Sequence, residues 1–169
     1  DPRNVITSIK NHYDYKSYEE AFKFMKDENK IIGVKGSTNE EDLPTPISSW
    51  KLHYNSWKNI INFKSKYILI KYEDLLKDPL NQFTKITAFI EKISEIKFNE
   101  KNIHKSIENT KFENLKKQEE LKGFKENPKN SKKFFNLGPN NDWRNLLDKN
   151  IRYEIEISFK NEMQDLGYL

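Results

Sequence analysis

The sequence contains no cysteine, which excludes a disulfide framework, a thiolate zinc site and a cysteine nucleophile. Its only histidines are His12, His53 and His104, and their spacing does not resemble a metal-ligand pattern. The longest apolar run, residues 67–70, is too short to span a membrane. Residues 1–4 do not resemble the start of a secretory signal peptide. We therefore expect a protein of the reducing cytoplasm, with no bound metal and no membrane partner.

Arginine is also scarce, because only 3 of the 30 basic residues are arginine and the rest are lysine. With 26 acidic residues the net charge is +4. Proteins that read nucleic acids usually rely on the planar fork of arginine, so we expect no nucleic-acid partner, and a lysine-rich nucleic-acid binder is the weakest alternative. The length of 169 residues is typical of one domain, on a scale of roughly 100–200 residues per domain. The sequence therefore predicts a single domain over residues 1–169.

Most of the chain shows the apolar spacing of amphipathic helices. Pro2 suits a first helical turn, Ser17 and Glu20 have the spacing of a capping box, and residues 78–79 open another helix. The last helix is expected over residues 146–164. The apolar stripes are Val5, Ile6 and Ile9; Tyr18, Phe22 and Met25; Trp50, His53, Tyr54, Trp57, Ile60 and Ile61; Phe83, Ile86, Phe89, Ile90 and Ile93; and Ile151, Ile155, Phe159 and Met163.

One segment, residues 66–72, predicts the principal strand. A short continuous apolar run is typical of a buried parallel strand with helices on both faces. Residues 29–46 and 123–133 are rich in turn-forming and polar residues and predict loops. A parallel strand needs a parallel neighbour, and no second strand of this kind is predicted. We therefore expect an α/β fold, of which this chain forms a mostly helical part with one main strand.

Four groups of residues, in order along the chain, resemble motifs of the cytosolic-type sulfotransferase family, including its bacterial members. Residues 1–8 resemble the family's 3'-phosphate motif, and residues 49–57 resemble the helix before its central strand. Residues 68–79 resemble the Tyr-Glu-Asp signature that ends in Asp-Pro. Residues 110–116 and 134–144 resemble the adenine-contacting segment and the phosphate loop. The resemblance covers almost the whole chain and corresponds to the C-terminal portion of the family's domain.

This resemblance implies a fold and an activity. The family has a P-loop-NTPase-like, three-layer fold with a parallel sheet. Its enzymes transfer a sulfuryl group from 3'-phosphoadenosine 5'-phosphosulfate (PAPS) to a hydroxyl or amine of a small-molecule or carbohydrate acceptor. The catalytic histidine, the phosphosulfate-binding loop and the arginine of the 3'-phosphate motif correspond to positions upstream of Asp1. We therefore expect no catalytic residue within the chain and no activity of this chain alone.

The resemblance also assigns residues to the nucleotide. Ser8 matches the serine that donates a hydrogen bond to the 3'-phosphate, and it is expected in the opening turns of a helix, whose N-terminus suits anions. Tyr72 matches a tyrosine that contacts adenine. Thr110 and Phe112 match the hydroxyl and the stacking ring of the adenine pair. The alternative from the residues alone is that Ser8 is an ordinary residue near a helix start and that Tyr72 and Phe112 are core residues.

The phosphate loop departs from the family pattern. Asn136, Leu137 and Gly138 stand where the family commonly has Arg-Lys-Gly. Gly138 retains the permissive backbone that lets amides approach a phosphate, but both cationic side chains are replaced. Charge-assisted hydrogen bonds are roughly twice as strong as neutral ones, so the replacement predicts a weaker affinity for the 3'-phosphate. Residues 132–133 and Arg144 are the candidates to compensate for this loss.

Two other features have simpler interpretations. His53 is expected at the edge of the core, and Arg3 falls at a variable, solvated position of the motif, so neither receives a role. The main alternative function is a non-catalytic helical protein-interaction module that uses the stripe from Trp50 to Trp57. The sulfotransferase hypothesis instead predicts that five residues share one nucleotide-sized cleft: Ser8, Tyr72, Thr110, Phe112 and Gly138.

Overall fold

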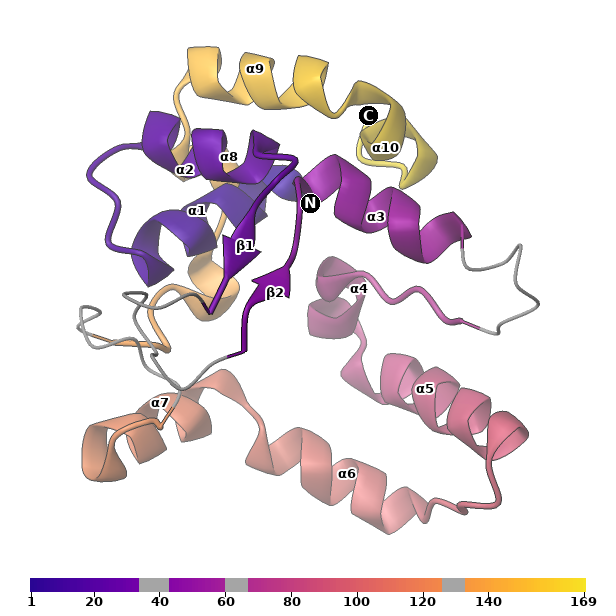
Figure 1. Ribbon diagram of the computed structural model, residues 1–169. Coiled ribbons are helices and arrows are strands. Elements are labelled where there is room, and N and C mark those ends of the chain that lie inside the picture. The colour runs from indigo at the N-terminus through magenta and orange to yellow at the C-terminus, as the bar shows by residue number, and fades with distance from the viewer. Residues whose placement is uncertain (34–42, 60–66, 126–132) are drawn as a thin grey trace. The chain divides into compact units, whose positions relative to one another are not determined.

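The computed structural model describes residues 1–33, 43–59, 67–125 and 133–169 (Figure 1). The chain forms two compact units: unit 1 comprises Asp1–Ser65 and Phe124–Leu169, and unit 2 comprises Lys66–Gly123. Each unit is considered by itself. The described residues form ten α-helices and one two-stranded sheet, so the predicted mostly helical structure is confirmed.

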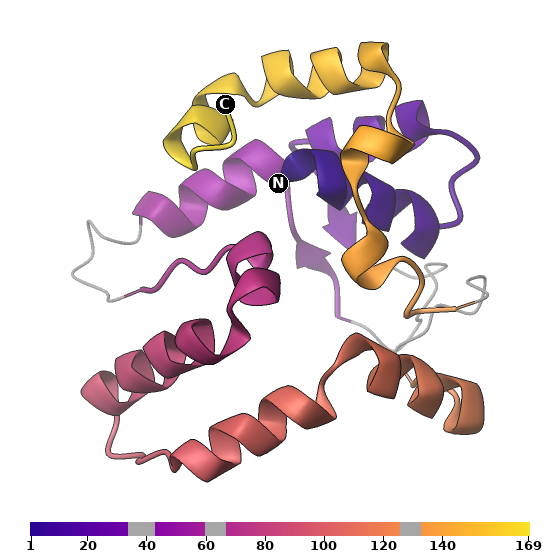
Figure 2. The same cartoon turned by 180° about the vertical axis from the view of Figure 1, so that it is seen from behind.

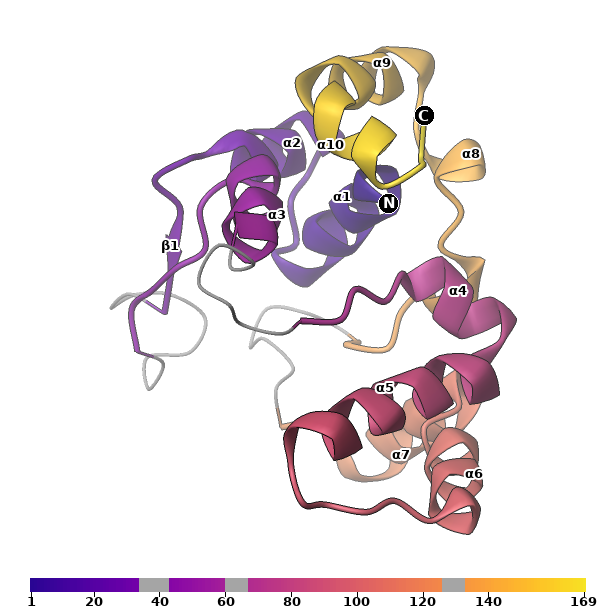
Figure 3. The same ribbon diagram turned by 90° about the vertical axis from the view of Figure 1, so that its right-hand side faces the viewer.

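Unit 1 is built from the two ends of the chain, and its C-terminal helices α9 and α10 lie across α2 and α3 (Figures 1 and 3). Its elements are α1 (Pro2–His12), α2 (Tyr18–Lys26), β1 (Ile31–Ile32), β2 (Thr45–Pro46), α3 (Trp50–Lys58), the 3-10 helix η2 (Gly138–Asn140), α8 (Trp143–Leu146), α9 (Lys149–Ser158) and α10 (Lys160–Asp165).

Local side-chain caps set the starts of the first two helices. The Asp1 carboxylate accepts a hydrogen bond from the Arg3 amide at 3.0 Å, and Pro2 occupies the first turn of α1. Ser17 Oγ accepts from the Glu20 amide at 3.4 Å, while the Glu20 carboxylate accepts from the backbone N–H one residue before Ser17 at 3.0 Å. The Ser17 half of the predicted capping box is confirmed, whereas Glu20 accepts from the residue before Ser17 instead of from the N–H of Ser17 itself. A serine cap of this kind typically stabilises a helix by ~1 kcal/mol.

The core of unit 1 lies where α1, α2, α9 and α10 meet. The rings of Phe22 and Phe159 meet edge to face with centroids 6.2 Å apart. Each large apolar side chain that is fully buried contributes roughly 1.5–3 kcal/mol to folding. The stripes predicted for the first two helices and for the C-terminal segment supply this core, which comprises Ile6, Ala21, Phe22, Met25, Ile151, Ile155, Phe159 and Met163.

Two boundaries differ from the prediction. The single helix expected over residues 146–164 begins at Lys149 and is interrupted at Phe159, whose backbone (φ −119°, ψ 23°) leaves the helical region between α9 and α10. The loop expected over residues 29–46 contains the short antiparallel pair β1–β2, in which Ile31 lies opposite Pro46. A two-residue pairing of this kind has too little apolar alternation to be visible in the sequence.

The predicted strand over residues 66–72 is wrong. Residues 67–71 form no strand, α4 begins at Tyr72, and residue 66 lies outside the described residues. Lys71 does have an extended backbone (φ −84°, ψ 139°), but a strand also needs a hydrogen-bonded neighbour, and the described residues supply none here. Leu69 is 53% exposed, so the apolar run is not a buried strand.

Unit 2 comprises α4 (Tyr72–Lys77), α5 (Pro79–Ile93), α6 (Glu100–Asn109) and α7 (Phe112–Lys122). Helix α5 packs against both α4 and α6. As predicted, α5 opens at residues 78–79, where the Asp78 carboxylate accepts a hydrogen bond from the Asn81 amide at 3.2 Å. The apolar stripe of α5 is only half-buried, and Ile93 is 51% exposed. The predictions for Ile60, Ile61 and Lys132 lie outside the described residues.

Candidate functional site

Ser8 lies on the exposed side of α1. Because α1 begins at Pro2, Ser8 is in the second turn, where α-helical geometry already pairs the backbone N–H groups within the helix. The expected place of Ser8 in the opening turns of a helix is confirmed, but its own N–H is not one of the free amides of the helix N-terminus. What Ser8 offers to a ligand is its hydroxyl group.

A hydrogen bond links Ser8 to the segment between η2 and α8. Asn141 Nδ2 donates to Ser8 Oγ at 3.3 Å and to the Asn4 carbonyl at 3.0 Å. The Trp143 amide in turn donates to Asn4 Oδ1 at 2.9 Å. These contacts hold α8 beside α1 (Figure 2). The structure thus brings together the predicted 3'-phosphate motif and the predicted phosphate loop, although Ser8 and Asn141 are 133 positions apart.

The predicted phosphate loop is a compact turn. Gly138 has a φ of 52°, in the left-handed region that favours glycine. The amide of Asn140 donates to the Leu137 carbonyl at 3.0 Å, and the amide of Asn141 donates to the Gly138 carbonyl at 3.1 Å. Pro139 has no N–H. Two amides of this turn are therefore already used, which limits how many amides could meet a phosphate.

The cations near this turn are few. Asn136 and Leu137 are neutral, and Lys133 is exposed at the start of the segment. The side chain of Arg144 is 68% exposed and lies 3.2 Å from the Asp142 carboxylate. An exposed pair of this kind is weak, so the guanidinium of Arg144 can exchange this carboxylate for another anion at little cost.

Arg3 is buried at 6% exposure, so its expected solvated position is wrong. Its guanidinium lies 2.7 Å from the Asp1 carboxylate and 2.7 Å from the Glu156 carboxylate. It also donates to the Tyr168 carbonyl at 3.1 Å and stacks over the Trp143 ring, 4.1 Å from its centroid. These partners use the donors of Arg3, which therefore serves the fold rather than a phosphate.

Glu156 is charged in this arrangement. Burial is the largest influence on its pKa and tends to raise it. Hydrogen bonds from Arg3 at 2.7 Å and Arg152 at 3.0 Å outweigh burial and hold the pKa of Glu156 below its ordinary value of 4.5. The Glu156 carboxylate is thus an anion at neutral pH and compensates the buried Arg3.

The residues expected to contact adenine lie in unit 2. Tyr72 is the first residue of α4 and is 52% exposed; partial burial, with the nearby Glu73 carboxylate, raises the pKa of Tyr72 and keeps its phenol protonated. Thr110 is the C-cap residue that follows α6, and its Oγ1 donates to the Ser106 carbonyl at 2.8 Å. Phe112 begins α7 and is half-buried. The short α6–α7 junction thus keeps Thr110 and Phe112 close together.

The expected site is divided between the two units. Ser8 and Gly138 belong to unit 1, whereas Tyr72, Thr110 and Phe112 belong to unit 2. The structure brings Ser8 next to the Gly138 turn within unit 1. A cleft shared by all five residues stays a prediction.

Comparison with known protein families shows which family the chain belongs to. The profile described as Sulfotransferase domain matches residues 1–167. The chain belongs to the sulfotransferase family. This membership implies a transferase that moves a sulfuryl group, and the family fold is P-loop-like. Comparisons with curated proteins and with solved structures found no match.

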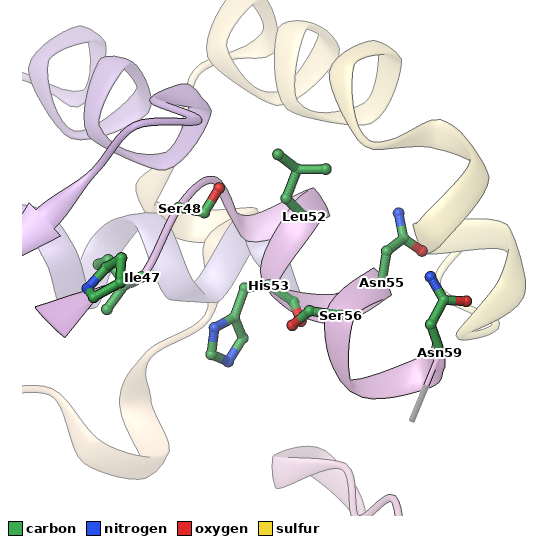
Figure 4. Close-up of a pocket in the computed structure, with 8 residues that line it drawn as sticks. Ile47, Ser48, Leu52, His53, Asn55, Ser56 and Asn59 are labelled. Atoms are coloured by element: carbon green, nitrogen blue, oxygen red, sulfur yellow. The ribbon is translucent and has the colours of Figure 1, made fainter. Parts of the chain in front are cut away.

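Within this sulfotransferase domain, one pocket of about 430 Å³ lies beside β2 and α3 (Figure 4). His53 lines it and is exposed, so its expected place at the core edge is wrong. Ser56 Oγ donates to the His53 carbonyl at 2.7 Å instead of to the imidazole. Ser56 therefore does not form with His53 a serine–histidine pair of the kind that activates a nucleophile.

Helix α3 presents two different faces. Trp50 packs on Phe159 with ring centroids 5.1 Å apart, and the Tyr54 hydroxyl donates to the Asp165 carboxylate at 2.6 Å. Trp57 is 56% exposed. The interaction-module alternative requires one continuous surface that includes both tryptophans. The two tryptophans do not form such a surface.

The described part of the chain contains no group of three or more histidine, aspartate or glutamate side chains able to hold a metal ion together. Nor does any helix in that part have the length and apolar character needed to cross a membrane.

Three residues of unit 1 have roles that the sequence did not reveal. Asn4 and Asn141 connect the two motifs, and Arg3 connects α1 to α9. Asn4 and Asn141 are 137 positions apart and carry no periodic or motif signal that would pair them. Only the tertiary structure reveals these contacts.

Proposed function

We propose that this chain carries the 3'-phosphate-binding residues of a PAPS-dependent sulfotransferase that acts on a hydroxyl or amine acceptor. The observation that supports this function best is the hydrogen bond between Asn141 and Ser8. It joins, within unit 1, two motifs that the family uses for the same phosphate group. PAPS supplies the sulfuryl group when it is bound.

In this proposal Ser8 Oγ donates a hydrogen bond to an oxygen of the 3'-phosphate. Gly138 has no side chain, so a phosphate can approach its backbone closely. Arg144, an exposed residue three positions after Asn141, supplies a positive charge in place of the family's Arg-Lys pair. The site relies more on neutral donors than the family pattern does, and we expect a correspondingly lower affinity.

We further propose that Tyr72, Thr110 and Phe112 contact the adenine, as the family pattern implies. The hydroxyl hydrogen of Thr110 is directed to the Ser106 carbonyl, so Thr110 Oγ1 offers a lone pair to a donor. The exocyclic amino group of adenine is such a donor. The half-buried ring of Phe112 offers an apolar face for stacking.

Titration calorimetry with adenosine 3',5'-bisphosphate tests this proposal. Ser8→Ala is expected to weaken binding about tenfold or more, because a hydrogen bond to a charged group contributes ~1.5–3 kcal/mol. The matched control is Ser56→Ala, an exposed serine on α3 whose loss should leave the affinity unchanged. Absence of binding to the wild-type chain, or equal affinities of wild type and Ser8→Ala, would overturn the proposal.

A further inference from the structure

The side-chain amide of Asn141 has three partners on α1. Its Nδ2 donates to the Asn4 carbonyl at 3.0 Å and to Ser8 Oγ at 3.3 Å. Its Oδ1 accepts from the hydroxyl of Thr7, which is 1% exposed. One side chain therefore contacts a backbone oxygen, a buried hydroxyl and the exposed hydroxyl of the proposed phosphate site.

The Asn4 carbonyl determines which way this amide faces. A carbonyl oxygen only accepts hydrogen bonds, so the group that lies 3.0 Å from it must be the NH₂ of Asn141. The opposite orientation would place Asn141 Oδ1 against the Asn4 oxygen, with two acceptors facing each other. The second hydrogen of the same NH₂ then points to Ser8 Oγ.

The orientation of the Asn141 amide determines whether the Ser8 hydroxyl donates or accepts within the protein. A hydroxyl has one hydrogen and two lone pairs, and Asn141 occupies one lone pair. Among the described residues, the Ser8 hydroxyl is thereby an acceptor within the protein. Its hydrogen is left for a ligand on the exposed side of α1. A group that only accepts hydrogen bonds, such as a phosphate oxygen, is the ligand that this arrangement suits.

We propose that Asn141 is a positioning residue that orients the Ser8 hydroxyl as a donor and so favours nucleotides with a 3'-phosphate. This inference rests on the proposed function. Asn141 itself need not touch the nucleotide, because it acts through Ser8. Its loss therefore weakens binding of a 3'-phosphorylated nucleotide and leaves binding of the same nucleotide without that phosphate unchanged.

The test compares the affinities for adenosine 3',5'-bisphosphate and adenosine 5'-monophosphate. Asn141→Ala is expected to weaken bisphosphate binding roughly three- to tenfold, the effect of one neutral hydrogen bond, with the monophosphate affinity unchanged. Asn150→Ala, which truncates an exposed asparagine on α9, is the matched control and should change neither affinity. A general loss of structure would lower both affinities together.

A double-mutant cycle gives the second measurement. In a Ser8→Ala background, Asn141→Ala should have no further effect on the ratio of the two affinities, because the hydroxyl it orients is gone. If Asn141→Ala does not fold, Asn141→Asp replaces it, because it keeps the size and the acceptor but loses the donor. The negative charge of Asn141→Asp is present both in the wild-type background and in the Ser8→Ala background. The difference between its effects on the affinity ratio in the two backgrounds therefore measures the effect that depends on Ser8.

The outcomes separate the two proposals. If the wild-type chain binds both nucleotides equally, the proposed function fails and this inference fails with it. If the wild type prefers the bisphosphate and Ser8→Ala loses that preference, the proposed function stands. In that case, the inference about Asn141 is overturned, and the proposed function is not, if the Asn141 variants keep the preference for the bisphosphate. The same holds if these variants reduce the preference equally with and without the Ser8 hydroxyl.

Discussion

Arg3 connects several segments of unit 1. Its planar guanidinium reaches carboxylates at Asp1 and Glu156, the Tyr168 carbonyl and the face of Trp143 at the same time. A lysine has a single ammonium group and could not bridge these partners with the same geometry. Arg3 therefore ties the start of α1 to α8, to α9 and to the C-terminal residues of the chain.

Removing Arg3 should be costly, because it leaves buried or partly buried carboxylates without their partner. Arg3→Ala is expected to lower the free energy of unfolding by about 3 kcal/mol, measured by urea denaturation. Arg152→Ala, at a half-exposed arginine that also bonds to Glu156, should cost about 1 kcal/mol or less. An ordinary surface substitution changes the free energy of unfolding by roughly 0.5 kcal/mol or less. A loss of this size for Arg3→Ala would contradict this role.

Glu156 should contribute to acid sensitivity. Its pKa is lower in the folded chain than its ordinary value of 4.5, so the unfolded state takes up protons first. Its stabilising effect is present in full above pH 4.5 and is lost as the pH falls through the folded-state pKa. Glu156→Gln should therefore show a smaller loss of stability between neutral pH and the acid range than wild type does.

Urea denaturation at a series of pH values measures this difference. Glu154→Gln, at an exposed position two residues earlier on the same helix, is the control and should follow the wild-type pH profile. A Glu156→Gln profile parallel to wild type would mean that the ion pairs of Glu156 do not contribute to acid sensitivity.

At the scale of elements, the two faces of α3 predict unequal roles for its tryptophans. Trp50→Ala removes a ring that packs on Phe159 and should destabilise unit 1 by about 2 kcal/mol. Trp57 is 56% exposed, so Trp57→Ala should change stability by less than about 0.5 kcal/mol. Equal losses in urea denaturation would show that the two faces of α3 are packed alike.

The elements that the sequence predicted correctly are those determined by neighbouring residues. The stripe of Phe22 and Met25 and the Ser17–Glu20 capping box act within a few residues of one another. The strand expected over residues 66–72 was wrong because an apolar run alone does not provide a pairing partner. The β1–β2 pair was missed because it spans only two residues on each side.

In the candidate site too, local features were predictable from the sequence and contacts between distant segments were not. Ser8 and Gly138 could be singled out because each falls in a recognisable motif, and the structure places their segments together. The burial of Arg3 and the pairing of Asn4 with Asn141 depend on which distant segments pack against α1. No local pattern encodes those contacts.

At the scale of the whole molecule, the 169 residues match the sulfotransferase family over almost their full length. From the resemblance to the family's motifs, we expect that these residues do not include the phosphosulfate loop and that none of His12, His53 and His104 is the catalytic histidine. A positioned general base typically contributes about 10²–10⁴-fold to a rate. We therefore expect this chain alone to bind the nucleotide without transferring its sulfuryl group.

An assay with radiolabelled PAPS and a panel of phenols, alcohols and amines checks this expectation. The predicted result is no transfer above the rate without protein, in a preparation that binds adenosine 3',5'-bisphosphate. Robust turnover would mean that the catalytic residues lie within these 169 residues.

Recognition of a 3'-phosphate by unit 1 depends, in the proposed function, on the Ser8–Asn141 contact and the adjacent turn. Its most direct test is amide chemical-shift mapping by NMR with adenosine 3',5'-bisphosphate and, separately, with adenosine 5'-monophosphate. The predicted result is that the amides of Ser8, Gly138 and Asn141 shift with the bisphosphate and far less with the monophosphate. Identical chemical-shift changes with both nucleotides would contradict recognition of the 3'-phosphate at this place. So would a bisphosphate titration in which the signals of these three amides do not move.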